Sequence, residues 1–497
     1  MGGIAVVTFV LLAGLGVQAT DEAWFLSVTA RLARGDVLYR DVYSVTTPVA
    51  FWLSLGAVKV AGTQLLVIRA LNVASFVVTI ELLRRMVARR GVGGAGQALL
   101  IAVIWILGSP VSHRVALYSG LAITLTVAAW YCLDSPGPSR SRGRLALVGV
   151  LAGLAFQTKP NIGGLALVAI ALVLAVEQRH APDGRGRLHD VAVVAAGFGV
   201  AAGAVLATVA ATGGLRGYID YVFLNKGSYL DAGVSYFNQI GDAARLAARS
   251  GASIAARVLT MTILVPIVAV AALVVAFVRA RPRVRVLEPA AFTVVGLVAL
   301  YPRVTPTHIT AATPLLLAGA FLTWQSARSG APRRAWPKPA IGLAAAVLAL
   351  AFGAVVVRSV DGLTGDHGPV RHFAGVPMNA RRAARLRSEL GHLRAATGGN
   401  VFIVRPDAGE LYLIGDLTDP TPFDIPEQTD FGPNDEDDAI RVIERNPVRF
   451  VCLDPDAGHP NRRRPLLSPL KLERYVRRHF EATADFGVCR LYERRSA

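Results

Sequence analysis

The chain has 497 residues, of which 53% are hydrophobic and 17% are charged, and its mean hydropathy is +0.47. A soluble globular protein carries roughly 25% charged residues, so this composition excludes an ordinary soluble domain. The net charge of +18 would suggest nucleic-acid binding in a soluble protein, but no basic patch here is interleaved with exposed aromatic residues.

Repeated apolar runs predict the fold class, because about 20 such residues cross a bilayer as a helix. We expect a polytopic α-helical membrane protein with about eleven spans. The spans are expected at roughly 1–19, 64–83, 97–112, 116–133, 145–158, 161–176, 191–211, 258–278, 289–302, 311–325 and 339–357.

The sequence leaves two alternatives for the first span, retention as a membrane helix or removal by signal peptidase. "MGG" lacks a positively charged region, which favours a retained helix, whereas "VQA" at 17–19 resembles a signal-peptidase site.

Arginines and a lysine gather in alternate loops between these spans. The basic loops contain Arg84, Arg85, Arg89 and Arg90; Arg140, Arg142 and Arg144; Arg179, Arg185 and Arg187; Arg279, Arg281, Arg283 and Arg285; and Arg328, Arg333, Arg334 and Lys338. The positive-inside rule places these loops in the cytoplasm. We therefore expect loops 20–63 and 212–257, and everything after about 358, on the extracytoplasmic side of a bacterial cell membrane.

The opening outer loop is rich in side chains that can do chemistry. "AWFLSVTARLARG" (23–35) has helical apolar spacing and is expected to lie along the membrane surface. "TPVAFWLSLGAVKVAG" (47–62) is a short apolar run, which predicts a second interfacial helix or a re-entrant helix. Asp21 would then lie just above the bilayer, where a carboxylate can act as a general base toward a hydroxyl. The alternative is that Asp21 only caps the helix that follows it.

Several cationic residues are expected on the same side. Arg69 lies in the outer part of the second span, where an arginine is costly unless it faces protein, water or an anion. The others are Arg40, His113, Arg114, Lys159, Lys226, Arg303 and His308. Together they could line a pocket for a lipid phosphate, although each taken singly could be an ordinary loop or snorkelling residue.

The tail differs in composition from the rest, so we predict two domains, 1–357 in the membrane and 358–497 outside it. Helices are expected at 379–396, 435–446 and 471–480, and strands at 400–406, 448–454 and 487–495, which predicts a small α/β domain. Cys452 and Cys489 lie in two of these strands and could pair if the domain is extracytoplasmic, whereas Cys132 lies in an apolar run.

Motifs for nucleotide or metal binding give no functional prediction. "GVGGAG" (91–96) matches a dinucleotide-binding pattern, but it follows "RRMVARR" and enters an apolar run, so we interpret it as a linker. The sequence contains no C-x-x-C or H-E-x-x-H metal motif, no P-loop and no internal repeat.

These segments resemble a known family, the GT-C membrane glycosyltransferases, and in particular the bacterial relatives of glycosyltransferase family 39, which include protein O-mannosyltransferases and aminoarabinose transferases. The resemblance covers nearly the whole chain and rests on "DEAWF", "ARLARGDVLYRDVYSVTTPVAFWL", "VIRALNVASFVVT", "GLAFQTKPNIGGLAL", "YPRVTPTHITAATPLLLAG", "ELYLIGDLTDPTPFD" and "IERNPVRFVCLD".

The resemblance implies that a sugar moves from a polyprenyl-phosphate donor to an extracytoplasmic hydroxyl of a glycan, lipid or protein, with inversion. Asp21 matches the essential acid of the first loop and would be the base, Glu22 would orient it or the acceptor, and Asp41 matches a second acidic position. Lys159 and Arg69 match basic positions. No cofactor is required by the pattern, but a divalent metal (Mg, Mn or Ca) held by acids is a further possibility.

One departure concerns the donor phosphate. Many relatives read K-P-P where this chain has Thr46, Thr47 and Pro48, so another cation would have to serve here, such as Arg40 or Arg303.

Two other classes remain open at the level of sequence. A lipid-linked sugar transporter or flippase usually places charged sites near the midplane within repeated halves, and this chain shows neither. The second alternative class is a cell-wall assembly protein that has the same fold but no catalytic activity.

Overall fold

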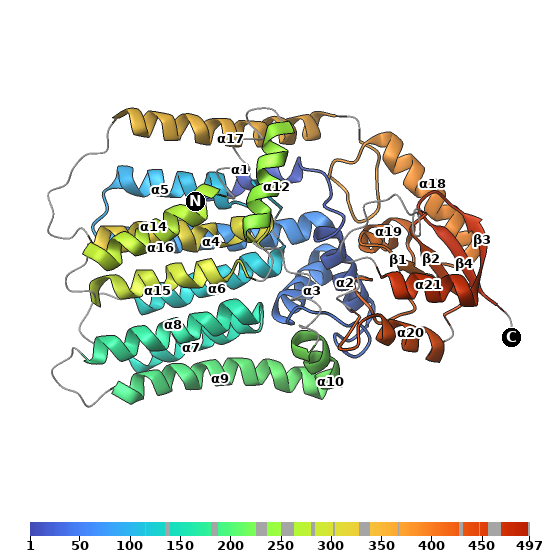
Figure 1. The fold of residues 1–497 in the computed structure, drawn as a ribbon, viewed down its shortest axis with the longest axis horizontal. Helices are drawn as coiled ribbons and strands as arrows, with labels where there is room; N and C mark the ends of the chain where they lie inside the picture. Colours follow the sequence, from blue (N-terminus) through green and yellow to red (C-terminus); the bar gives the residue numbers. More distant parts are fainter. Residues whose placement is uncertain are drawn as a thin grey trace. The chain divides into compact units, whose positions relative to one another are not determined.

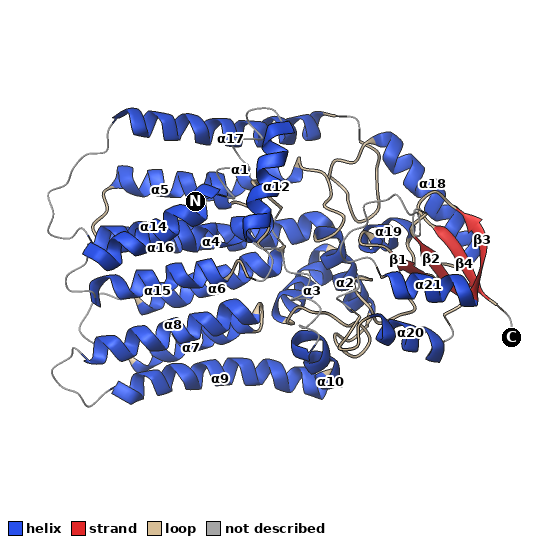
Figure 2. Ribbon diagram, in the orientation of Figure 1, coloured by secondary structure: helices blue, strands red, loops and turns tan. Residues whose placement is uncertain are grey.

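The computed structural model describes residues 1–114, 116–134, 140–179, 187–224, 236–249, 263–279, 284–301, 304–327, 338–365, 367–426, 431–446, 448–455 and 469–495. Among these residues, strands occur only in the C-terminal region and the rest of the regular structure is helical (Figure 2).

The chain forms two compact units, each assembled from separated segments. The first contains Met1–Leu12, Ala70–Val205 and Val234–Val360, and the second contains Ala13–Arg69, Leu206–Gly233 and Asp361–Ala497. The second unit thus joins the predicted outer loop to the C-terminal region. The boundary predicted between residues 357 and 358 stays a prediction, because these units are defined by packing and not by order along the chain.

A helix occurs at each predicted span, which confirms the polytopic helical fold. These helices are α1 (Gly2–Ala13), α4 (Leu65–Arg89), α5 (Gly94–Gly108), α6 (Leu117–Leu133), α7 (Arg142–Phe156), α8 (Pro160–Arg179), α9 (Arg187–Ala211), α14 (Val265–Arg279), α15 (Val284–Val298), α16 (Pro306–Ala327) and α17 (Lys338–Thr364), with α12 (Tyr236–Arg249) in addition. Within the described residues, α4, α8 and α9 are long and apolar enough to cross a membrane by themselves. Shorter apolar helices include α1, α5, α6, α14 and most of α15.

Neighbouring helices of the first unit pack closely side by side. Helix α16 packs against α14 and α15, and α7 packs against α6 and α8 (Figure 1). Glycines allow α7 and α9 to approach closely, because a Cβ at Gly149 or Gly197 would collide with the backbone of the other helix. Such small-residue contacts are characteristic of membrane helices, which lack a hydrophobic driving force toward each other in lipid.

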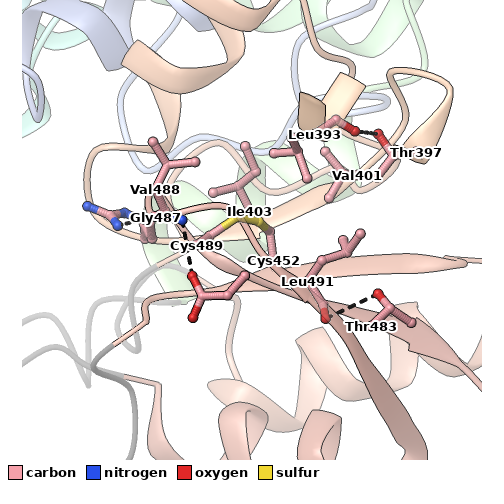
Figure 3. Close-up of a disulfide and its surroundings, with 12 residues drawn as sticks. Leu393, Thr397, Val401, Ile403, Cys452, Thr483, Gly487, Val488, Cys489 and Leu491 are labelled. Carbon is pink, nitrogen blue, oxygen red and sulfur yellow. Dashed lines mark hydrogen bonds between the residues drawn. A yellow bond between two sulfur atoms is a disulfide. The ribbon is translucent and has the colours of Figure 1, made fainter. Parts of the chain in front are cut away.

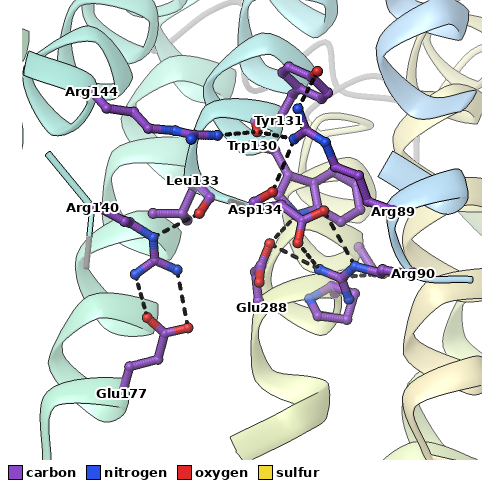
Figure 4. Close-up of polar contacts among 12 residues, drawn as sticks. Arg89, Arg90, Trp130, Tyr131, Leu133, Asp134, Arg140, Arg144, Glu177 and Glu288 are labelled. Atoms are coloured by element: carbon purple, nitrogen blue, oxygen red, sulfur yellow. Dashed lines mark hydrogen bonds and ion pairs between the residues drawn. The ribbon is translucent and has the colours of Figure 1, made fainter. Parts of the chain in front are cut away.

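Arginines of the predicted cytoplasmic loops close the end of α6. The last carbonyl groups of a helix have no partner within it, so basic side chains bind there favourably. Arg89 donates to the Asp134 carbonyl, Arg140 donates to the Leu133 carbonyl at 2.8 Å, and Arg144 donates to the Cys132 carbonyl at 2.5 Å (Figure 4). These arginines therefore stabilise the end of α6 within the helical bundle.

Ion pairs link the same region to other helices. Arg90 contacts Asp134 at 2.9 Å and Glu288 of α15 at 3.2 Å, and Trp130 donates to Glu288 at 2.8 Å (Figure 4). Helices α4, α6 and α15 are thereby joined at one end.

The second unit combines the outer-loop helices with the C-terminal elements. These are α2 (Glu22–Arg34), α3 (Val49–Ala61), α10 (Leu215–Ile219), the π-helical turn η1 (Asp220–Leu224), α18 (Ala380–Thr397), β1 (Phe402–Val404), α19 (Ala408–Gly415), α20 (Glu436–Arg445), β2 (Phe450–Leu453), α21 (Leu470–His479), β3 (Phe480–Asp485) and β4 (Arg490–Arg494). The two helices predicted in the outer loop correspond to α2 and α3.

The sheet has the strand order β1-β2-β4-β3. β1 pairs with β2 in parallel, and β4 pairs antiparallel with both β2 and β3. The three predicted strands are confirmed, and β3 is an additional strand that the sequence did not predict. Because β3 lies at the edge and most of its residues are exposed, it lacks the apolar run that marked the others.

Cys452 and Cys489 form a disulfide, with their Cα atoms 5.6 Å apart (Figure 3). Cys452 belongs to β2 and Cys489 directly precedes β4, and both are fully buried. Disulfides persist in oxidising compartments and are rare in the cytosol of ordinary bacteria. The pairing that the sequence left open is therefore made within the C-terminal sheet.

Candidate active site

Asp21 lies directly before α2 and keeps its carboxylate out of the helix cap. Its backbone carbonyl accepts a hydrogen bond from the Phe25 amide at 3.0 Å, but its side chain makes no capping bond to α2. The Gln18 side-chain amide instead donates to Asp21 Oδ2 at 2.8 Å. The alternative role for Asp21, a side-chain cap, is thus not formed.

Glu22 and Arg69 form a buried ion pair beside Asp21. Arg69 Nε and Nη2 donate to the two carboxylate oxygens of Glu22 at 2.9 and 2.7 Å, and the exposed fractions of the two residues are 1% and 7%. Arg69 also donates to the carbonyls of Leu15 and Gly16 at 2.7 and 2.9 Å. This geometry fixes the segment that leads into α2 and favours a positioning role for Arg69 through Glu22. A phosphate contact of Arg69 stays a prediction.

Asp41 holds a tight loop closed together with Arg40. Its carboxylate accepts hydrogen bonds from the Val37 amide at 2.8 Å and from Arg40 Nε and Nη2 at 3.0 and 2.8 Å. The hydrogen bonds from Arg40 are the main cause that lowers the pKa of Asp41, so it is ionised in the neutral range. Tyr39 in this loop has a left-handed φ of 67° and is buried, which is an uncommon conformation for a bulky residue.

Of the two threonines at the position where relatives have K-P-P, Thr46 is partly exposed and Thr47 is buried. The Thr46 backbone carbonyl accepts from the Tyr39 hydroxyl, and Ser44 Oγ lies 3.0 Å from Thr46 Oγ1. Thr47 is fully buried, and its hydroxyl has no hydrogen-bond partner within the part of the chain that the structure describes. A threonine carries no charge, so the contact to a donor phosphate stays a prediction for another residue, such as Arg40 or Arg303.

Two of the predicted site residues, Lys159 and His308, belong to the first unit. Lys159 lies just before α8, where its ammonium donates to Ser119 Oγ at 3.1 Å and lies 5.6 Å from the Tyr118 ring centre. His308 lies in the first turn of α16, with Nδ1 2.8 Å from Thr305 Oγ1. Both side chains are partly exposed. Lys226 and Arg303 lie outside the described residues.

The predicted divalent metal would need a cluster of acidic or histidine side chains. Among the residues that the structure describes, no group of three His, Cys, Asp and Glu side chains is arranged to hold an ion. A divalent metal therefore stays a prediction of the resemblance.

Two residues near Asp21 were missed by sequence reasoning. Gln18 precedes the acid by three positions, a spacing that could have signalled contact. Asp424 accepts from Trp24 Nε1 at 3.1 Å across 400 residues, and no local pattern announces such a pair.

Asp419 provides a pH-dependent contribution to stability in the same unit. Burial raises its pKa to about 6, against the opposing effects of Arg31 and hydrogen bonds from Thr421. A carboxyl whose folded pKa is raised contributes stability below its unfolded pKa of about 4, and this contribution is lost as the pH rises through about 6.

We expect Asp419→Asn to stabilise the protein by about 1–2 kcal/mol at pH 8, and the difference between variant and parent should disappear near pH 4. This stabilisation is smaller than the full pKa shift would give, because Asp419 keeps some exposed surface. Thermal unfolding in detergent at both pH values measures it. Asp416→Asn is the contrasting control, because hydrogen bonds from Arg394 and then Arg371 lower the pKa of Asp416. That variant should be destabilised at pH 8 and recover as the pH falls. Equal shifts for Asp419→Asn at pH 4 and pH 8 would contradict the assignment.

No protein-family model and no curated protein matches the sequence. Among solved structures, ArnT from Cupriavidus metallidurans bound to undecaprenyl phosphate is similar, with a TM-score of 0.56, 13% identity, and coverage of 99% of this chain and 96% of that chain. The apo state of the same protein gives a TM-score of 0.54 at 13% identity over 99% and 96% of the two chains.

An oligosaccharyltransferase from Archaeoglobus fulgidus, in a complex with Zn and sulfate, has a TM-score of 0.50 at 10% identity, covering 91% of this chain and 68% of that chain. At these identities the likeness establishes a shared fold.

Proposed function

We propose, starting from the GT-C fold that this chain has, that it is a membrane glycosyltransferase that moves a sugar from a polyprenyl-phosphate donor to an extracytoplasmic hydroxyl acceptor. The observation that carries the proposal is the state of Asp21. Its carboxylate is oriented by Gln18 and is not used for capping, beside a Glu22 that is locked by Arg69. The likeness to a protein that binds undecaprenyl phosphate supports the class of donor.

The proposed reaction is a single inverting displacement. Asp21 takes the proton of the acceptor hydroxyl as that oxygen attacks the anomeric carbon of the sugar. The bond from the anomeric carbon to the phosphate oxygen breaks, and the polyprenyl phosphate leaves with the electron pair. Because a phosphate leaves as a stable anion, one base suffices and no acid is needed to protonate the leaving group.

Cations stabilise the charge of the departing phosphate. Arg40 and Lys159 are the candidates with partly exposed cationic groups, and His308 can add a hydrogen bond or a charge. Lys226 and Arg303 complete the proposed set.

The assay that tests this function separates the competing classes. Purified protein in nanodiscs is given a radiolabelled polyprenyl-phosphate sugar and a hydroxyl acceptor. A glycosyltransferase releases polyprenyl phosphate and labels the acceptor. A flippase moves the donor between leaflets without releasing it, and an assembly protein does neither, so either of these results would refute the proposal.

The orientation of the membrane domain is a separate prediction. The basic loops and the disulfide both support an extracytoplasmic C-terminal region in the bacterial cell membrane. In a Cys132→Ala background, Gly365→Cys should react with an impermeant thiol reagent on intact cells, and Ser141→Cys should react only after the cells are lysed. The reverse labelling would contradict the orientation and place Asp21 on the wrong side.

A further inference from the structure

A C-terminal segment binds the helix that follows Asp21. We call residues Asp419–Ile425 the docking segment. Arg31 of α2 donates to the Thr421 carbonyl at 2.9 Å, and the Tyr43 amide donates to the Pro422 carbonyl at 2.6 Å. Trp24 Nε1 donates to Asp424 Oδ2 at 3.1 Å. All of these residues belong to the second unit.

The Trp24 side chain that donates the hydrogen bond to Asp424 is buried among aromatic rings. Trp24 is 4% exposed, and its ring lies edge-on to those of Phe25 and Phe51, at 6.1 and 6.0 Å between centroids. Asp424 Oδ1 accepts from the Ile425 amide at 2.9 Å, which orients the carboxylate. A buried Trp N–H that lost its acceptor would be left unpaired at a cost of about 1–3 kcal/mol, so the bond restrains the rotation of α2.

A second contact comes from α19, directly before the docking segment. A Cβ at Gly409 would lie 2.7 Å from Trp24 Cα and 3.0 Å from the Ala23 carbonyl oxygen. Only glycine allows the two backbones to approach this closely. Helix α19 is itself fixed to α18, because Arg382 pairs with the buried Glu410 at 2.7 Å.

The first turn of α2 is therefore held from three directions. Glu22 is held by Arg69, the Trp24 side chain by Asp424, and the backbone of Ala23 and Trp24 by Gly409. Asp21 is the residue that enters this turn.

We propose that Asp424 and Gly409 are positioning residues for the reaction, because they fix the first turn of α2 and thereby the place of the Asp21 carboxylate. This inference rests on the proposed function. A general base must come within about 3 Å of the proton it takes, and a displacement near 1 Å can cost on the order of 100-fold in rate.

The test combines activity with a measurement that needs no substrate. Asp424→Ala, Trp24→Phe and their double variant are prepared as full-length protein in nanodiscs, with Asp485→Ala as a matched control at an exposed aspartate of β3. We expect each single variant to lower kcat by about 10-fold with little change in KM, and the double variant to lose no more than one of the singles. Asp424→Asn keeps an acceptor for Trp24 and should recover most of the activity.

Hydrogen exchange gives the second readout. Amides of residues 22–32 should exchange at least several-fold faster in Asp424→Ala and in Gly409→Ala than in the parent, and Asp485→Ala should match the parent. Unchanged exchange in α2, additive losses in the double variant, or a rise in KM at constant kcat would overturn the proposal. A parent that transfers no sugar would refute the proposed function alone, since the exchange data would still decide whether the docking segment fixes α2.

Discussion

Asp21→Asn should lower the rate of sugar transfer by about 10²–10⁴-fold, the typical contribution of a general base. The asparagine oxygen can still accept the hydrogen bond that Gln18 donates to Asp21 Oδ2. No side-chain cap is lost either, because Asp21 makes none to α2. The variant should therefore fold like the parent, and the loss would report the missing proton acceptor. Initial rates of polyprenyl phosphate release measure the effect.

The control for this variant is Asp485→Asn, which makes the same chemical change on the exposed edge of the sheet. It should retain full activity. If Asp21→Asn turned over as fast as the parent, the assignment of the base would be wrong. If it lost activity together with its thermal stability, the role of Asp21 would be structural.

Removing one member of the buried Glu22–Arg69 pair should destabilise the protein by about 3–5 kcal/mol, because the other charge remains buried without compensation. Glu22→Ala removes both carboxylate contacts of Arg69, whereas the contacts to the carbonyls of Leu15 and Gly16 carry no full negative charge. The same variant frees the segment that leads into Asp21, so activity should fall as well. Thermal unfolding and chemical denaturation in detergent measure the change.

The double variant Glu22→Leu/Arg69→Met separates the cost of leaving one buried charge unpaired from the loss of the ion pair itself. Replacing both partners by apolar side chains removes the unpaired charge, so it should recover much of the stability that Glu22→Ala loses. Activity should stay low, since the carbonyls of the 15–22 segment lose their donor. The exposed pair Arg490–Asp485, with its two atoms 3.3 Å apart, is the control, and Asp485→Ala should cost less than about 1 kcal/mol. Equal losses for the buried and exposed pairs would refute this account.

The helices of the membrane region could be predicted because each needs its own apolar run. In lipid a helix satisfies its backbone hydrogen bonds within itself. The pattern that predicts α4 or α9 is therefore a single continuous apolar run in the sequence. The outer-loop helices α2 and α3 were predictable for the same local reason. The strand β3 was not, because an exposed edge strand takes its hydrogen bonds from β4 and needs no apolar pattern of its own.

The acids of the candidate site could be located from the sequence, but their roles could not be separated. Asp21 and Asp41 stand alike in the outer loop, yet Asp41 is held by Arg40 and the Val37 amide whereas Asp21 is oriented by Gln18. Arg69 looked like a candidate for an anion, and its partner Glu22 lies 47 residues away in the sequence. Contacts at such separations depend on packing, which no local pattern records.

The contacts of the docking segment also bear on how the protein matures. Synthesis runs from the N-terminus to the C-terminus, so Asp21 and α2 are made before Gly409 and Asp424. The helices at the predicted spans, α1, α4 to α9 and α14 to α17, are therefore complete while the first turn of α2 still lacks two of its three supports. Under the proposed function and orientation, competence for transfer is acquired only after export and folding of the C-terminal region, so we expect a chain without that region to be inactive toward lipid-linked sugars.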